Sequence, residues 1–127
     1  MVHHRIKKAL IIEDEESWID LLGMLLHESH FHVTTTSSIK EGLKIAKAEK
    51  LDLLVVDLDL PDGFGMDLLK TISEIPGKED LPVIVLSAYH REEVGDMDFG
   101  KAHFVSKDQG LPPLLASLES MNGRIHD

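Results

Sequence analysis

Short apolar runs that end in polar residues alternate along this chain with longer amphipathic segments, and this alternation limits the possible folds most strongly. The run Leu53–Val56 is apolar at every position and is followed directly by Asp57. A strand that is apolar on both faces is typical of a parallel sheet covered on both sides. Three similar apolar runs and one β-branched run predict the other strands, at residues 9–12, 32–36, 83–86 and 102–105.

The segments between these runs have the spacing of amphipathic helices. Ser38 followed by Glu41 forms a capping box and predicts a helix that runs through Ala48. Other helices are expected at residues 18–26, 66–75 and 111–121, with a weak one at 92–97. Strands that alternate with helices predict an α/β fold with a parallel sheet, right-handed crossovers and helices on both faces.

Length and composition exclude several classes of protein. The 127 residues fit one compact domain, which we expect to span 1–127 with a core of about 6–122. The net charge of −10 leaves no basic footprint for direct contact with nucleic acid. The absence of cysteine removes disulfides and thiolate metal sites. The apolar runs are too short to span a bilayer, so we expect a cytoplasmic protein without membrane contact.

Polar residues follow four of the predicted strands. Glu13 and Asp14 follow the first strand, Asp57 ends the third, Ser87 follows the fourth and Lys107 follows the fifth. Ligands bind beyond the carboxyl ends of such strands, so we expect these side chains to meet there. Carboxylates held together repel each other until a divalent cation binds, and few hard oxygen ligands suit Mg2+. The lysine and the hydroxyl complete a cradle for a phosphoryl group, which a carboxylate can accept as nucleophile.

These motifs, in this order, resemble the receiver domain of two-component response regulators over nearly the whole chain. The matching segments are Ile11–Glu15, Val55–Gly65, Val85–Ala88 and Phe104–Lys107. The resemblance implies a flavodoxin-like, doubly wound five-stranded parallel sheet with strand order 2-1-3-4-5. It also implies Mg2+-dependent transfer of a phosphoryl group from a histidine kinase or phosphotransfer protein. A switched surface would then act on a downstream protein target that the sequence does not identify. Such a domain catalyses only its own phosphorylation and dephosphorylation, so we expect no enzyme with an external substrate.

The resemblance assigns roles to residues by position. Asp57 is the phosphoacceptor, Ser87 contacts the phosphoryl group and Lys107 pairs with it. Ser87 and Phe104 form the switch, in which the aromatic ring rotates inward behind the hydroxyl. The 20 residues between Ser87 and Lys107 are about two fewer than a full fourth helix needs. We therefore predict that the helix near residues 92–97 is short, irregular or mobile.

The same resemblance assigns a metal site and two residues that tune dephosphorylation. The expected Mg2+ ligands are Glu13, Asp14, Asp57 and the backbone carbonyl of Asp59. Asp59 and Tyr89 occupy the positions that govern how water reaches the acyl phosphate. The bulk of Tyr89 leads us to expect slow hydrolysis.

Two other families and one variant of the receiver share some of these features. Asp57 and Asp59 after an apolar strand resemble the nucleophile motif of haloacid-dehalogenase-like phosphatases, where that motif normally lies on the first strand. Glu13 with Asp57 and Asp59 resembles the metal triad of topoisomerase-primase domains, against which the acidic composition, Ser87 and Lys107 argue. A receiver-like interaction module that is never phosphorylated is the third alternative.

Overall fold

The computed structural model describes residues 6–60, 62–88 and 101–122. Tyr89 and the predicted helix near 92–97 lie outside the described residues. The elements in chain order are β1 (Lys7–Ile12), α1 (Glu16–Glu28), β2 (Phe31–Thr36), α2 (Ile39–Ala48), β3 (Leu53–Asp57), β4 (Asp59–Leu60), β5 (Gly63–Phe64), α3 (Gly65–Ser73), β6 (Val83–Ser87), β7 (His103–Ser106), a 3-10 turn (Lys107–Gln109) and α4 (Leu111–Asn122). None of the described helices has the length and apolarity that crossing a membrane requires.

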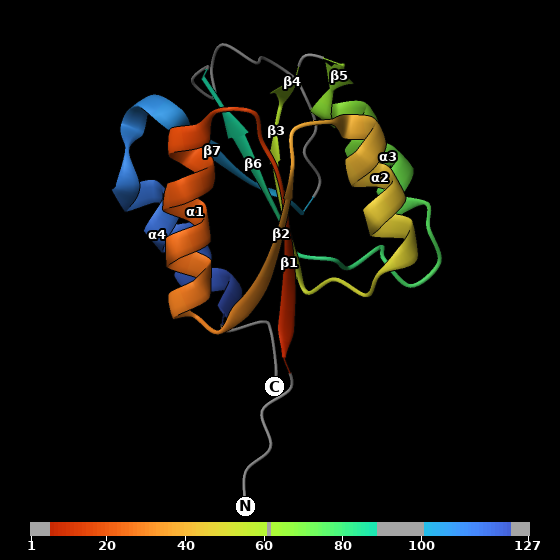
Figure 1. The fold of residues 1–127 in the computed structure, drawn as a ribbon, viewed down its shortest axis with the longest axis horizontal. Helices are drawn as coiled ribbons and strands as arrows, with labels where there is room; N and C mark the ends of the chain where they lie inside the picture. Colours follow the sequence, from red (N-terminus) through yellow and green to blue (C-terminus); the bar gives the residue numbers. More distant parts are fainter. Residues whose placement is uncertain (1–5, 61, 89–100, 123–127) are drawn as a thin grey trace, which may run out of the picture.

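Five parallel strands form the central sheet, in the order β2-β1-β3-β6-β7. The short strands β4 and β5 pair only with each other, as an antiparallel hairpin. When this hairpin is left out of the count, the order is the predicted 2-1-3-4-5. Figure 1 shows α1 and α4 on one side of the sheet and α2 and α3 on the other. The predicted flavodoxin-like, doubly wound α/β fold is therefore confirmed.

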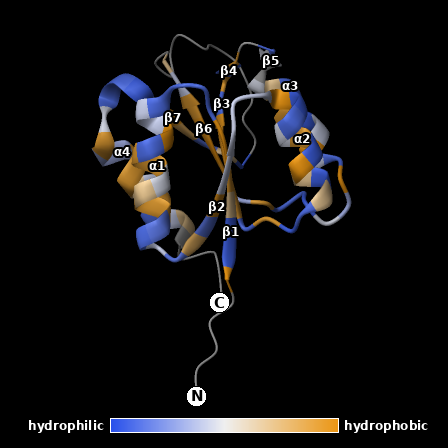
Figure 2. Cartoon of the chain, viewed as in Figure 1, coloured by the Kyte–Doolittle hydropathy of each residue, from blue (hydrophilic) through white to orange (hydrophobic). Residues whose placement is uncertain are grey.

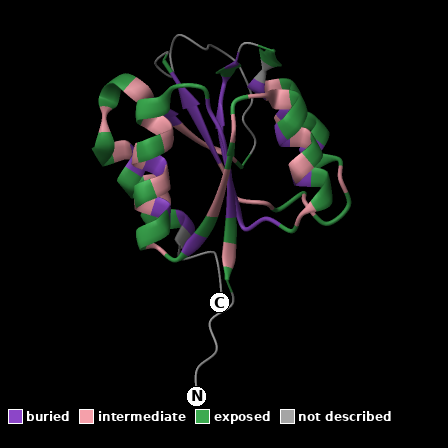
Figure 3. Ribbon diagram, in the orientation of Figure 1, coloured by how far each residue is buried: buried purple, intermediate pink, exposed green. Residues whose placement is uncertain are grey.

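Each strand contributes side chains to two separate cores, because successive residues point to opposite faces of a sheet. On β1, Ala9 and Ile11 join the core beneath α1 and α4, whereas Leu10 and Ile12 join the core beneath α2 and α3. Every residue of β3 is buried, as the strands coloured purple in Figure 3 show. Figure 2 shows the corresponding pattern of apolar strands and helices with mixed faces. Burial on both faces explains why these strands read as continuous apolar runs.

The N-terminus of α2 is tied to the loop that follows β3. Ser38 Oγ accepts a hydrogen bond from the Glu41 N–H at 3.1 Å, which confirms Ser38 as the N-cap. The carboxylate of Asp62 accepts hydrogen bonds from Ser38 Oγ and from the Ile39 N–H, each at 2.9 Å. The Ile39 N–H contributes most to lowering the pKa of Asp62. Asp62 thus connects the loop beside the expected site to the start of a helix.

Some element boundaries differ from the sequence-based prediction. The helix predicted over 66–75 begins at Gly65 and ends at Ser73. Past its end, the Glu74 and Ile75 N–H groups bond to carbonyls three residues earlier, at 3.2 and 3.0 Å. This tighter turn precedes Pro76, and a residue before proline disfavours the α conformation. The β4–β5 hairpin was not predicted, and β7 lies one residue later than expected.

Candidate functional site

The predicted site residues meet at the carboxyl edge of the central sheet. Glu13 follows β1, Asp57 ends β3, Ser87 ends β6, and Lys107 begins the turn after β7. Glu13, Asp57 and Ser87 are buried, with exposed fractions of 0%, 4% and 1%. Hydrogen bonds continue the sheet past these side chains, from Glu13 N–H to the Thr36 carbonyl at 3.0 Å and across β3 and β6. The sheet itself therefore fixes the backbone beneath the acidic groups.

Three carboxylates form a group that could hold a metal ion. Glu13, Asp14 and Asp57 each offer an oxygen, and these oxygens lie within 4.8 Å of one another. Asp14 is exposed, so the group opens to solvent on one side. No other set of three histidines or acids among the described residues has this geometry. The structure therefore brings together three of the predicted metal ligands.

The carboxylate of Glu13 has one satisfied oxygen and one that lacks a hydrogen bond. Oε1 accepts the backbone N–H groups of Asp14 and Glu15, at 3.0 and 3.1 Å. Oε2 is buried and accepts no hydrogen bond from the described residues, although it lies 2.9 Å from Lys107 Nζ. The ion pair with Lys107 compensates part of its charge, and a carboxylate oxygen has a second lone pair that can bind a further partner. A hard cation with oxygen ligands fits this position, so the residues present suit Mg2+.

Burial is the main reason that the pKa of Glu13 is raised to about 7. The charge of Asp57 raises it further, whereas the hydrogen bonds from the Glu15 N–H and Lys107 oppose the shift. Desolvation wins because the side chain is fully enclosed. Without a cation, this site therefore carries less negative charge near neutral pH than its three carboxylates suggest.

The ammonium of Lys107 lies among three carboxylates. Nζ donates hydrogen bonds to Glu15 Oε1 at 2.6 Å, Glu13 Oε1 at 3.1 Å and Asp57 Oδ2 at 3.3 Å. Burial alone would lower the pKa of Lys107. The hydrogen bonds to Glu15 and Glu13, with the charges of Glu13 and Asp57, outweigh burial and raise the pKa to about 12. Lys107 is thus a permanent positive charge beside Asp57.

Two backbone features hold Asp57 in place. The Asp59 N–H donates to Asp57 Oδ1 at 3.0 Å, which orients the carboxylate. Gly65 N–H donates to the Leu58 carbonyl at 2.8 Å, which closes the loop between β3 and α3. A Cβ at position 65 would lie 2.8 Å from the Asp57 carbonyl oxygen and 3.1 Å from Leu58 Cα. Only glycine lets the backbone approach Asp57 this closely.

The other predicted site residues in the described part of the chain are Ser87, Phe104 and Asp59. Ser87 is one residue beyond Leu86, which pairs with Asp57, so it lies on the site edge of β6. Phe104 is half-buried on β7 and packs against the core beneath α2 and α3. Asp59 is exposed in β4. The switch role of Ser87 and Phe104 and the tuning role of Asp59 stay predictions.

The sequence did not predict three contacts made by Lys107 and by the turn that carries it. Glu15 and Trp18 both approach the ammonium, with the Trp18 ring centroid 5.8 Å from Nζ. The only signal in the sequence was the run of acids at 13–16, followed by Trp18 one helical turn later. Ser106 Oγ donates a hydrogen bond to Asp108, which braces the turn that carries Lys107.

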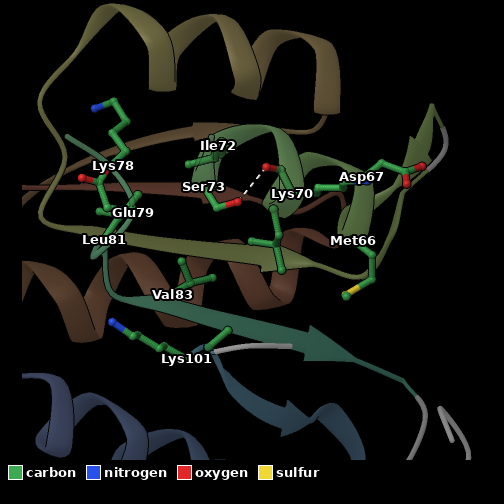
Figure 4. Close-up of a pocket in the computed structure, with 12 residues that line it drawn as sticks. Met66, Asp67, Lys70, Ile72, Ser73, Lys78, Glu79, Leu81, Val83 and Lys101 are labelled. Atoms are coloured by element: carbon green, nitrogen blue, oxygen red, sulfur yellow. Dashed lines mark hydrogen bonds between the residues drawn. The ribbon is translucent and has the colours of Figure 1, made fainter. Parts of the chain in front are cut away.

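A cavity of about 530 Å³ lies away from these residues, against α3 and the start of β6. Figure 4 shows Met66 and Lys70 of α3 and Lys101 among the side chains that line it. Its lining does not include the three carboxylates of the metal-binding group, Ser87 or Lys107. Lys101 directly follows residues 89–100, which lie outside the described part of the chain. The cavity therefore contributes nothing to the site at the carboxyl edge.

Comparison with known sequences identifies relatives of this chain. A family profile for the response regulator receiver domain matches residues 9–119. The KDP operon transcriptional regulatory protein KdpE of Escherichia coli is 33% identical over 112 residues, which cover 87% of this chain and 48% of KdpE. The chain thus spans about half the length of that relative. Two-component response regulator ARR12 of Arabidopsis thaliana is 38% identical over 85 residues, covering 65% of this chain and 14% of ARR12.

Comparison with solved structures agrees with the sequence relatives. Chemotaxis response regulator CheY4 of Vibrio cholerae superposes with a TM-score of 0.81 at 18% identity, covering 92% of this chain and 99% of CheY4. That likeness concerns the fold alone. Response regulator TrrA of Thermotoga maritima, solved in complex with Mg(2+)-BeF, gives a TM-score of 0.77 at 25% identity and covers 91% of this chain and 98% of TrrA. Together with the profile match across residues 9–119, these similarities show that the chain belongs to the family of response regulator receiver domains.

Proposed function

We propose that this receiver domain accepts a phosphoryl group on Asp57 in a Mg2+-dependent reaction. The observation that carries the proposal is the position of Asp57: its buried carboxylate lies 3.3 Å from the Lys107 ammonium and within 4.8 Å of the Glu13 and Asp14 oxygens. A nucleophilic carboxylate, a fixed cation and an acidic metal-binding group are the parts that phosphoryl transfer to an acid needs.

The transfer forms one bond and breaks one. An Asp57 carboxylate oxygen bonds to phosphorus as the bond between phosphorus and the donor group breaks, and the donor keeps that electron pair. Lys107 neutralises charge on the phosphoryl oxygens, and the Ser87 hydroxyl donates a hydrogen bond to one of them. Glu13, Asp14, Asp57 and the Asp59 carbonyl would hold Mg2+, which supplies further positive charge against those oxygens when bound. The Asp59 N–H, bonded to Asp57 Oδ1 at 3.0 Å, leaves Oδ2 on the side that faces Lys107.

The proposed donor is a phosphohistidine on a histidine kinase or a phosphotransfer protein, in the cytoplasm. Receiver domains are in general signalling domains rather than enzymes. We therefore propose that this chain catalyses only the gain and loss of its own phosphoryl group. The switch would run through Ser87 and Phe104 to a surface that binds a downstream protein, with residues 1–127 acting as one domain with a core of about 6–122. Asp59 and Tyr89 would set how fast water removes the phosphoryl group.

Intact-mass analysis after incubation with Mg2+ and acetyl phosphate tests the proposal. The expected result is one added phosphoryl group on the wild-type chain, none on Asp57→Asn, and none after chelation of the metal. Asp67→Asn is a matched control, because Asp67 is an exposed acid in the first turn of α3, outside the acidic group. If neither acetyl phosphate nor a phosphohistidine donor adds mass to the wild-type chain, the proposal is wrong.

The interaction module that is never phosphorylated is the alternative within the same family. It requires that Asp57 stay unmodified with every donor, which the same mass measurement detects. The combination of an acidic group that could hold a metal and an ammonium 3.3 Å from Asp57 favours the phosphoacceptor over this alternative.

A further inference from the structure

Lys107 has an ionic partner that the proposed transfer does not use. Its Nζ lies 2.6 Å from Glu15 Oε1, compared with 2.9 Å from Glu13 Oε2 and 3.3 Å from Asp57 Oδ2. The contact with Glu15 is thus the shortest that the ammonium makes among the described residues. The Lys107 side chain is 8% exposed and that of Glu15 is 54% exposed, so Glu15 holds the ammonium from the solvent side.

The hydrogen-bonding capacity of the ammonium is fully used in this arrangement. A lysine ammonium has three N–H donors and no acceptor. Lys107 donates to three carboxylates, one each from Glu13, Glu15 and Asp57. A phosphoryl group on Asp57 can accept the N–H that now points to the Asp57 carboxylate. The phosphoryl group accepts a second N–H of the ammonium only if the ammonium releases another carboxylate.

Among the carboxylates that hold Lys107, Glu15 is the one outside the group that could hold a metal. The group of oxygens within 4.8 Å of one another contains Glu13, Asp14 and Asp57, and Glu15 is not part of it. Glu15 would therefore stay bonded to Lys107 if the other acids bound a cation. Because Glu15 is the N-cap residue of α1, its backbone is fixed by hydrogen bonds from Trp18 and Ile19, each at 3.0 Å.

We propose that Glu15 is a positioning residue that holds the Lys107 ammonium at the solvent rim of the site and competes with the phosphoryl group for it. The inference rests on the proposed function, because it concerns how readily Asp57 gains a phosphoryl group. Glu15 acts through Lys107 and does not touch the reacting atoms. The negative charge of Glu15 opposes the approach of a dianionic phosphoryl donor and draws the lysine away from Asp57. Removing that charge therefore frees one N–H of the ammonium to bond to the phosphoryl oxygens.

Two charge-removing variants test the competition. Glu15→Gln removes the charge and weakens the contact, and Glu16→Gln removes an equal charge from the next position, an exposed residue in the first turn of α1. With Mg2+ at physiological ionic strength, where remote surface charges are screened, Glu15→Gln should lower the half-saturating concentration of acetyl phosphate by about twofold to fivefold. Glu16→Gln should leave that concentration unchanged. Equal shifts in the two variants, or a higher concentration for Glu15→Gln, would overturn the proposal.

Trp18 provides a readout in the resting protein. It is the single tryptophan of the chain, and its ring lies 5.8 Å from Lys107 Nζ. Because Glu15 helps to keep the ammonium over that ring, Glu15→Gln should change the Trp18 emission before any donor is added, and Glu16→Gln should not. Unchanged emission in Glu15→Gln would also overturn the proposal. If the wild-type chain takes up no phosphoryl group, the proposed function fails together with this inference. If it does so and the two variants match, only this inference fails.

Discussion

Replacing Gly65 with alanine should disturb Asp57, the proposed phosphoacceptor, through the backbone alone. The added Cβ would lie 2.8 Å from the Asp57 carbonyl oxygen and 3.1 Å from Leu58 Cα, whereas ordinary contacts begin at 3.4 Å. Both neighbours are backbone atoms at the end of β3, so no flexible side chain can move aside. Asp57 and α3 must separate by about half an ångström, and overpacking of this kind costs about 2 kcal/mol.

Gly23 offers a matched glycine in a helix with open space around it. A Cβ there would meet nothing within 4 Å, so Gly23→Ala should stabilise the chain by about 0.5–1 kcal/mol through helix propensity. Urea unfolding of the two variants should therefore give shifts of opposite sign. The rate of phosphorylation by acetyl phosphate should fall in Gly65→Ala and stay at the wild-type value in Gly23→Ala. A Gly65→Ala chain with wild-type stability and wild-type rate would refute the reasoning.

Three further predictions concern charge and helix capping. Because the pKa of Glu13 is raised from 4.5 to about 7, the folded chain keeps a proton that the unfolded chain has released. Without metal, the free energy of unfolding should thus fall by up to about 3 kcal/mol between pH 4.5 and pH 7, and urea titrations of Glu13→Gln should lack this fall. Lys107→Ala leaves buried carboxylates without their cation, so the free energy of unfolding should fall by about 3 kcal/mol at pH 8. Added Mg2+ should restore part of this loss in the same assay. An unchanged free energy of unfolding would contradict the buried ion pairs. Ser38→Ala should cost about 1 kcal/mol by loss of the α2 cap, against no change for the exposed neighbour Ser37→Ala.

The fold and the position of the site followed from the sequence because both depend on patterns that the topology enforces. A buried parallel strand must be apolar on both faces, so Leu53–Val56 could be recognised without tertiary information. Parallel strands also bring their carboxyl ends to one edge. Glu13, Asp57, Ser87 and Lys107 could therefore be placed together although 94 residues separate Glu13 from Lys107.

Other features could not be predicted because they depend on individual side-chain conformations or on turns too short to show a period. Strands β4 and β5 have two residues each, which is too few for any alternation to be read. The contact between Glu15 and Lys107 joins an exposed glutamate to a buried lysine that lies 92 residues later in the sequence. Asp62 caps α2 from 24 residues away, across a loop whose path only the structure gives. The repulsion among carboxylates that the sequence predicts raises the pKa of Glu13 only in part, because the largest cause is burial, which composition does not reveal.

The proposed function depends above all on Asp57 being the residue that carries the phosphoryl group. The most direct test is to treat the chain with a phosphohistidine donor and Mg2+, reduce the acyl phosphate with borohydride, and locate the modified residue by peptide mass spectrometry. We expect conversion of Asp57 to homoserine, no conversion of the neighbouring Asp59 or of Asp14, and no conversion without Mg2+. Modification at another acid, or none at Asp57 after exposure to a competent donor, would contradict it.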